Sequence, residues 1–339
     1  MICGACKQVL KLFKTKKMEK NSKTILVTGC AGFIGSNFVK TFLKRFPKIR
    51  VAGIDDFSSG KEILLPADIE FYRGSITDGA LLEDLFSKHK PSYVFHFGAI
   101  PRVSYSVKNP AETTRVNIYG TSLLLEKCRD HNATRFIFSS SSSVYGGAKK
   151  MPTKESQNPP NPQSPYAMQK LAGELLCKQF SKLYGLETIC LRYFNVFGPG
   201  QYGDSPYSTV ISAWLENLFF PKGAKPFIEG DGSQSRDFSY VDNVVEANIK
   251  SMQLAYGQLL GQTVNIACGS RTNLLEVKKL IERFTGRKIE LEKRPPRLGD
   301  VYHTQADLSL AKRLLGYKPI VQFKEGLKKT IEWYNGRKE

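Results

Sequence analysis

Short apolar runs alternate with amphipathic stretches along most of this chain. Five runs read as buried strands, at residues 24–27, 51–54, 69–72, 93–97 and 135–138. Helical spacing of apolar residues predicts helices to about residue 46 and over about 81–89, 112–130, 165–184, 274–284 and 323–334. Because strands and helices alternate, the pattern predicts an α/β fold, a Rossmann-type doubly wound parallel sheet.

A glycine pattern follows the first predicted strand. Gly29 permits a tight turn, Gly32 lets the backbone approach a diphosphate, and Gly35 allows close packing of the following helix. Free N–H groups and the helix dipole favour an anion at this helix start, which also includes Phe33 and Ile34. The pattern predicts a dinucleotide site.

The second predicted strand ends in Asp55, twenty residues after Gly35. A carboxylate at this place accepts hydrogen bonds from an adenosine ribose and repels a 2′-phosphate. Neither Asp56 nor Phe57 supplies the Arg that a phosphorylated cofactor needs. The sequence therefore favours NAD over NADP.

Candidate chemistry is concentrated between residues 138 and 170. Tyr166 and Lys170 are four residues apart on a predicted helix, so they share one face. A cation beside a phenol lowers the pKa of the phenol and makes it a usable general base. The serine run from Ser139 to Ser143 ends the preceding strand and could donate to the same substrate oxygen. Each signal taken alone also occurs by chance, since serine runs are often loops.

Composition excludes several classes of protein. A chain of 339 residues with 41% hydrophobic and 24% charged residues is ordinary for a globular protein. No apolar run approaches the roughly 20 residues that span a bilayer, so no membrane association is expected. The net charge is +19, but its basic residues are spread along the chain except for seven lysines between residues 7 and 23. Without a basic motif interleaved with aromatics, no nucleic-acid partner is expected.

Cysteine usage indicates reduced thiols. The seven cysteines lack the spacing of a disulfide framework, which favours a cytoplasmic protein. Cys3 and Cys6 resemble half a zinc site, but no second Cys or His pair follows at ligand spacing, so no metal is expected.

The glycine pattern from Thr28 to Gly35, Asn117, the serine run and the Tyr166–Lys170 pair together resemble the extended short-chain dehydrogenase/reductase family. The resemblance covers nearly the whole chain from Thr24 onward. Within that family the chain is most similar to UDP-hexose 4-epimerases, especially those acting on N-acetylated sugars. Three segments carry this likeness: 192–199, 230–238 and 297–300.

The resemblance implies a tightly bound NAD+ and a UDP-sugar substrate. It implies that Tyr166 takes the proton of the sugar 4-hydroxyl as hydride leaves C4, while Lys170 holds the nicotinamide ribose and Ser141 shares the 4-oxygen. Further implied cofactor contacts are Ser75, Ile76, Phe97, Gly98, Ala99, Asn117, Ser139 and Tyr193. Implied substrate contacts are Ser142, Ser143, Asn195, Thr209, Val210, Phe227, Arg236, Arg297, Asp300 and Thr304.

Single positions separate epimerases from their sister enzymes. The related 4,6-dehydratases carry Asp-Glu where this chain has Ser142 and Ser143, and the decarboxylases carry Glu at the second of these positions. The resemblance therefore favours epimerisation. Thr304 matches a gatekeeper position at which a small residue admits an N-acetyl group. UDP-glucuronate 4-epimerases stay an alternative, although they hold the sugar carboxylate with an Arg near the position of Tyr202.

The resemblance also implies how the chain is organised. Residues 1–23 form an extension, and 24–194 with 239–267 form the NAD-binding domain. Residues 195–238 and 268–339 form a smaller C-terminal α/β domain that binds the nucleotide sugar. Helices 112–130 and 165–184 would build a homodimer interface. A silent NAD-sensing protein on the same fold is a rival hypothesis, but it would be expected to lose Tyr166 or Lys170.

Overall fold

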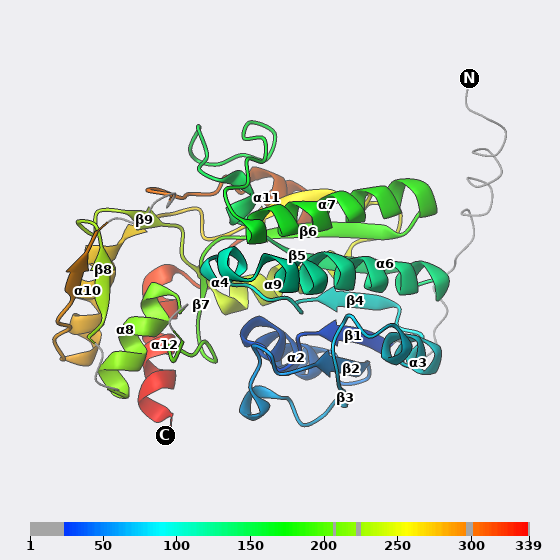
Figure 1. Ribbon diagram of the computed structural model, residues 1–339, viewed down its shortest axis with the longest axis horizontal. Helices are drawn as coiled ribbons and strands as arrows, with labels where there is room; N and C mark the ends of the chain where they lie inside the picture. The colour runs from blue at the N-terminus through cyan, green and yellow to red at the C-terminus, as the bar shows by residue number, and fades with distance from the viewer. Residues whose placement is uncertain (1–23, 206–207, 222–224, 296–300, 338–339) are drawn as a thin grey trace.

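The computed structural model describes residues 24–205, 208–221, 225–295 and 301–337. Its centre is a parallel sheet of seven strands in the order β11-β6-β5-β4-β1-β2-β3 (Figure 1). The strands are β1 (Thr24–Thr28), β2 (Arg50–Asp55), β3 (Glu70–Arg73), β4 (Tyr93–His96), β5 (Arg135–Ser141), β6 (Glu187–Tyr193) and β11 (Gln262–Ile266). The strand order reverses next to β1, which pairs with both β2 and β4, and ligands bind at such a reversal.

Helices cover both faces of this sheet, as a parallel sheet requires. On one face lie α2 (Phe33–Arg45), α9 (Val241–Gln253) and α11 (Ser309–Leu315). On the other lie α3 (Gly79–His89), α6 (Thr121–Asp130) and α7 (Pro165–Tyr184). Neighbouring strand residues alternate between the two cores: Val27 packs in the first and Leu26 in the second, both fully buried. The predicted doubly wound sheet is confirmed.

The predicted helix 112–130 has three parts. It consists of α5 (Pro110–Thr114), a π-helical segment η2 (Arg115–Gly120) and α6. The buried Asn117 lies in the π-helical segment and hydrogen-bonds the backbone of Ile100, after β4. A π-helical insertion of this kind often re-aims one side chain near a site.

A second group of elements lies beside the carboxyl ends of the strands (Figure 1). Its strands are β7 (Val196–Phe197), β8 (Phe227–Glu229), β9 (Ser235–Arg236), β10 (Ser239–Tyr240), β12 (Thr272–Asn273) and β13 (Glu292–Arg294). Its helices are α8 (Val210–Phe219), α10 (Leu274–Thr285) and α12 (Phe323–Gly336). These elements share a core around Trp214, Val277 and Leu327. The division into two domains stays a prediction, because α11 of the C-terminal part packs against the large sheet at β11.

Two short elements complete the cavity walls described next: α4 (Val103–Lys108) after β4, and the 3-10 helix η3 (Ser142–Tyr145) after β5. Among the residues described, no helix combines the length and apolar character needed to cross a membrane.

Candidate active site

The glycine turn lies between β1 and α2, as predicted. Gly29 has φ +70°, a left-handed conformation, and a Cβ there would lie 2.7 Å from the backbone nitrogen of Gly98. A Cβ on Gly35 would overlap the carbonyl oxygen of Gly29. The turn therefore needs glycine at both positions. It leaves the start of α2 without a side-chain cap and open to an anion.

Asp55 ends β2 beside this turn. Its carboxylate accepts hydrogen bonds from the backbone N–H of Ala31 (2.9 Å) and of Phe57 (2.9 Å). Burial raises the pKa of Asp55 above its usual range, against the effect of these donors. The loop after it was missed by sequence reasoning. Four residues of this loop line the first of the two cavities described below: Ser58, Ser59, Gly60 and Lys61. The one sequence feature that could have indicated them is the polar, glycine-containing run after the acidic end of the strand.

The predicted catalytic residues converge between β5 and α7. Helix α7 begins at Pro165 after Ser164, whose hydroxyl caps it by accepting from Ala167 N. Tyr166 is 8% exposed and Lys170 is 5% exposed. The ammonium of Lys170 donates to the Ser139 carbonyl oxygen at 2.8 Å.

The electrostatics of this pair differ from the sequence-based expectation. Burial raises the pKa of Tyr166 to about 12, partly offset by a hydrogen bond with Ser141. Burial also lowers the pKa of Lys170 to about 8. The expectation that Lys170 by itself brings the pKa of Tyr166 toward neutrality is therefore wrong. Its ammonium lies 5.9 Å from the centre of the phenol ring and is directed to the Ser139 carbonyl.

Two joined cavities contain most of the predicted site residues. The first, of about 580 Å³, is lined by Gly29, Gly32, Phe33, Ile34, Gly35, Asp55, Asp56, Ile76, Phe97, Gly98, Ala99, Ser139, Ser141, Ser142, Ser143, Tyr166, Lys170, Tyr193, Asn195, Thr209, Arg236 and Thr304. The second, of about 660 Å³, adds Val210 and Phe227. Asn195, Thr209 and Arg236 line both, so a single ligand could extend through the two.

Two of the described predicted residues, Ser75 and Asn117, do not line these cavities. The Ser75 hydroxyl contacts Thr77 in its own turn, at 3.0 Å. Asn117 donates to Gln169 (2.8 Å) as well as holding Ile100, so it supports the loop after β4 from behind. Arg297 and Asp300 lie outside the described residues.

The wall around Thr304 depends on a residue that sequence reasoning did not single out. The Thr304 hydroxyl accepts hydrogen bonds from Asn195 Nδ2 (3.3 Å) and from Asp237 N (3.2 Å). The fully buried carboxylate of Asp237 accepts from the backbone N–H groups of Cys268, Gly269 and Ala306, each at 3.0 Å. Asp237 thus joins three chain segments behind the predicted gatekeeper. In the sequence, the one feature that could have indicated Asp237 as a site residue is its position next to Arg236.

The second cavity has an aromatic side wall. Phe227 lies on β8, and the guanidinium of Arg294 stacks over its ring at 3.9 Å. Val210 is the first residue of α8 and packs against the core of this part. Arg102 is a further basic residue that lines both cavities, and it donates to the Ser205 hydroxyl at 3.1 Å.

The residues present fit a dinucleotide and a polar second ligand. The glycine turn leaves space that any side chain would fill, and Asp55 faces the turn. Ser143 Oγ is buried and has no hydrogen-bond partner within the described part of the chain. His96 is a packed residue at the end of β4, because it bridges Thr28 and Thr121 and burial lowers its pKa to about 3.

Known proteins resemble this chain over nearly its whole length. The NAD dependent epimerase/dehydratase family matches residues 25–267. A UDP-glucose 4-epimerase of Mycolicibacterium smegmatis is 37% identical over 322 residues, which covers 93% of this chain and 99% of the relative.

Two solved structures are similar at the level of the fold and the sequence. The UDP-N-acetylglucosamine 4-epimerase from Methanobrevibacter ruminantium M1, in complex with UDP-N-acetylmuramic acid, is 37% identical with a TM-score of 0.84. The UDP-glucuronic acid 4-epimerase from Bacillus cereus, in complex with UDP-glucuronic acid and NAD, is 31% identical with a TM-score of 0.82. Each alignment covers 92% of this chain and 98% of the other. These similar proteins are all 4-epimerases and differ in the sugar named.

Proposed function

Because the chain belongs to the NAD dependent epimerase/dehydratase family, we propose that it inverts C4 of a UDP-hexose through a transient 4-keto sugar. One observation carries this proposal: Ser141, Tyr166 and Lys170 meet in the cavity that the glycine turn also lines. The two positions after Ser141 hold neutral Ser142 and Ser143, which cannot supply the acid and base that elimination of water needs at neutral pH.

Three side chains have different roles in the proposed proton transfer. Tyr166 takes the proton of the 4-hydroxyl and returns it when the ketone is reduced on its other face. Ser141 hydrogen-bonds the same oxygen and holds it near Tyr166. Lys170 keeps a positive charge in the site that favours the phenolate. NAD+, when bound, supplies the hydride acceptor and a second positive charge that opposes the effect of burial on Tyr166. The cycle restores NAD+, so we expect it to be retained between turnovers.

The substrate side is proposed to take a UDP group and an N-acetylated sugar. Arg236 at the junction of the two cavities, with Arg297, would bind the diphosphate by guanidinium forks. Phe227 would pack on the uracil ring, and Asp300 would accept from ribose hydroxyls. UDP-glucuronate is a second candidate, since Arg102 lines both cavities and could pair with a carboxylate.

Product analysis tests the proposal directly. The purified protein is incubated with UDP-GlcNAc, UDP-Glc and UDP-GlcA separately, without added NAD, and products are identified by NMR. We expect UDP-GalNAc from the first and UDP-Gal from the second. Conversion of UDP-GlcA alone would instead establish the second candidate, and no conversion of any of the three would refute epimerisation.

Thr304→Tyr is expected to lower activity on N-acetylated UDP-sugars and to spare activity on UDP-sugars without an N-acetyl group. A bulky side chain at this position would occupy the space of the N-acetyl group, so kcat/KM for UDP-GlcNAc should fall about a hundredfold or more while that for UDP-Glc changes little. Thr304→Ser is the matched control, because it keeps the hydroxyl that Asn195 and Asp237 N contact. Equal losses on both sugars would argue against a gatekeeper role.

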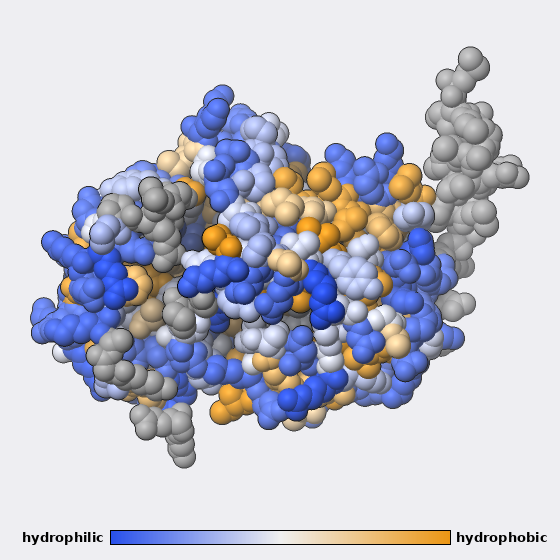
Figure 2. Space-filling view, viewed as in Figure 1, coloured by the Kyte–Doolittle hydropathy of each residue, from blue (hydrophilic) through white to orange (hydrophobic). Residues whose placement is uncertain are grey.

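We propose that the chain forms a homodimer through α6, α7 and the π-helical segment. Hydrophobic side chains gather over α6 and α7 on the face in Figure 2. Tyr119, Met168 and Leu175 are 50%, 44% and 55% exposed. An apolar patch of this kind marks an interaction surface in a protein of this size.

Leu175→Glu is expected to convert this dimer into a monomer, because a charge would be buried at the centre of the interface. The molar mass is measured by light scattering after size-exclusion chromatography. Ile320→Glu is the control, since Ile320 is 52% exposed but lies in the segment before α12. A wild-type protein that elutes as a monomer would remove the dimer proposal.

A further inference from the structure

A buried ion pair lies directly behind the catalytic lysine. Glu174 follows Lys170 by one turn of α7, and Arg192 lies on β6. Arg192 Nε donates to Glu174 Oε1 at 2.8 Å and Arg192 Nη2 to Oε2 at 2.6 Å. Both side chains are 5% exposed. A two-point contact of this kind is rigid and little screened by solvent.

The pair is tied to the strand that carries the reacting groups. Glu174 Oε1 also accepts a hydrogen bond from the Ser140 hydroxyl. Ser140 lies between Ser139, whose carbonyl accepts from Lys170, and Ser141, whose hydroxyl bonds Tyr166. The carboxylate therefore contacts the residue of β5 that lies between the two residues bonded to the catalytic pair.

Few other charges act on Lys170. Besides Glu174, the titratable side chains that act on it or line the cavity beside it include, in the described part of the chain, His96 on β4, Tyr166 and Cys177 on α7, and Tyr193 on β6. Burial lowers the pKa of His96 to about 3 and raises that of Tyr193 to about 12, so both are neutral at pH 7. Burial lowers the pKa of Lys170, and the charge of Glu174 is among the effects that oppose it.

We propose that Glu174 and Arg192 are positioning residues whose pairing keeps either charge from shifting the pH range in which Lys170 is protonated and Tyr166 can be ionised. The two act through their opposite charges, which largely cancel at the catalytic pair while both are present. The proposal rests on the function proposed above, since it takes Tyr166 as the base and Lys170 as its cationic partner.

Removing one partner exposes the charge of the other. Glu174→Gln leaves Arg192 uncompensated, which disfavours the ammonium of Lys170 and favours the phenolate of Tyr166. Both limbs of the pH–rate profile should then move to lower pH, by about one unit, because an uncompensated charge in the protein interior acts through an effective dielectric constant near 20. Arg192→Met leaves the carboxylate uncompensated and should move both limbs to higher pH. A pair with only a structural role would lower the rate without opposite shifts.

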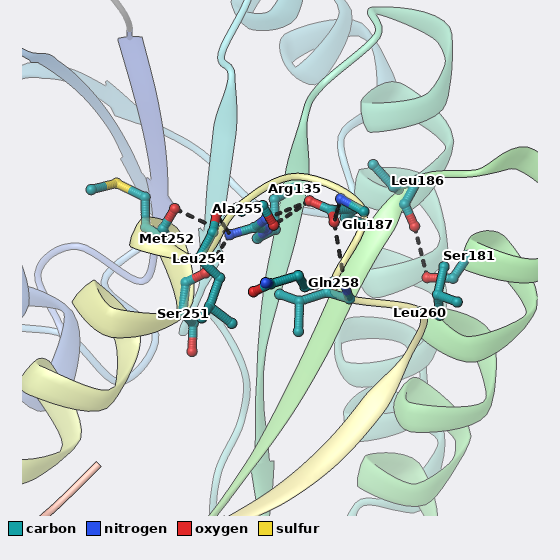
Figure 3. Close-up of polar contacts among 12 residues, drawn as sticks. Arg135, Ser181, Leu186, Glu187, Ser251, Met252, Leu254, Ala255, Gln258 and Leu260 are labelled. Carbon is teal, nitrogen blue, oxygen red and sulfur yellow. Dashed lines mark hydrogen bonds and ion pairs between the residues drawn. The ribbon is translucent and has the colours of Figure 1, made fainter. Parts of the chain in front are cut away.

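The chain contains a second buried ion pair, Arg135 on β5 and Glu187 on β6, that serves as a matched control. Arg135 and Glu187 start β5 and β6 and are directly opposite in register, as Ser140 and Arg192 are near the strand ends. Figure 3 shows Arg135 directed at Glu187 and at the carbonyls of Ser251, Met252 and Leu254. The pair is as buried as the first, 1% and 3% exposed, but neither residue lines the described cavities. Glu187→Gln and Arg135→Met should lower stability and leave the pH profile in place.

A spectroscopic titration provides a readout that does not need turnover. The tyrosinate absorbance of each variant, minus that of the same variant carrying Tyr166→Phe, reports the ionisation of Tyr166 alone. If the wild type epimerises no UDP-sugar, the proposed function fails, but this titration still tests the ion pair.

A milder variant covers the case in which the single charge removals do not fold. Ser140→Ala removes one neutral donor from Glu174 and should shift the titration to higher pH by about 0.3 unit. Shifts of the two charge variants in the same direction, or no shift in any of the three, would overturn the proposal.

Discussion

Tyr166→Phe is expected to abolish epimerisation while leaving the fold and the bound cofactor intact. The substitution removes the hydroxyl that is proposed to take the proton of the sugar 4-hydroxyl, and loss of a positioned base of this kind lowers kcat by about a hundredfold to ten-thousandfold. The ring keeps its packing, because Tyr166 is 8% exposed and, among the described residues, its hydroxyl loses the bond with Ser141. The measurement is kcat by NMR, together with the NAD content of the purified protein.

Tyr317→Phe is the matched control for this change. Tyr317 is also buried, 1% exposed, and its hydroxyl donates to the Ala267 carbonyl away from the described cavities. The control should lose about 0.5–1.5 kcal/mol of unfolding free energy from the missing hydrogen bond and keep its kcat. A Tyr166→Phe enzyme that interconverted UDP-sugars at a rate near that of the wild type would show that another group carries the proton.

Gly35→Val is expected to release the cofactor and weaken the fold together. The new side chain would overlap the Gly29 carbonyl, so the turn between β1 and α2 must move. Forced overpacking costs about 1–3 kcal/mol of unfolding free energy, and displaced N–H groups could no longer bind a diphosphate. NAD released on denaturation and urea unfolding curves measure the two effects.

Gly79→Ala is the control for the glycine variant. Gly79 starts α3, and a Cβ there meets no atom within 4 Å. Its NAD content should equal that of the wild type, and its stability should stay equal or rise by up to about 1 kcal/mol, since Ala is the better helix former. A Gly35→Val protein with a full complement of NAD would show that the close approach at this turn does not govern cofactor binding.

Local sequence patterns were sufficient for the elements that build the centre of the sheet. Strands buried on both faces must be continuous apolar runs, so β1, β2, β4 and β5 were predictable within one to three residues. Strands β6 and β11 were not predicted. Three of the five residues of β11 are polar: Gln262, Thr263 and Asn265. Its extended form depends on pairing with β6 and on contacts of Asn265 with Tyr145 and Thr153. Contacts between distant segments leave no local pattern.

In the candidate site, too, some features could be predicted from the sequence and others could not. The Tyr166–Lys170 pair and the glycine turn could be predicted from spacing, because each lies within one helix or one turn and its geometry follows from that element. Ser141 was singled out from the serine run only by the family resemblance. The direction of the pKa shift of Tyr166 could not be predicted from the sequence, since it depends on how deeply α7 is buried against β5.

By itself, the sequence determined the fold class, five of the seven strands of the sheet and the glycine turn, and it singled out the candidate catalytic pair. The tertiary structure alone decided which distant charges and carbonyls surround that group. Glu174 meets Arg192, and Asp237 reaches behind Thr304, only because the fold brings separate strands and loops together. Burial and partner distance, which control ionisation in a protein interior, are properties of that packing and not of any one segment.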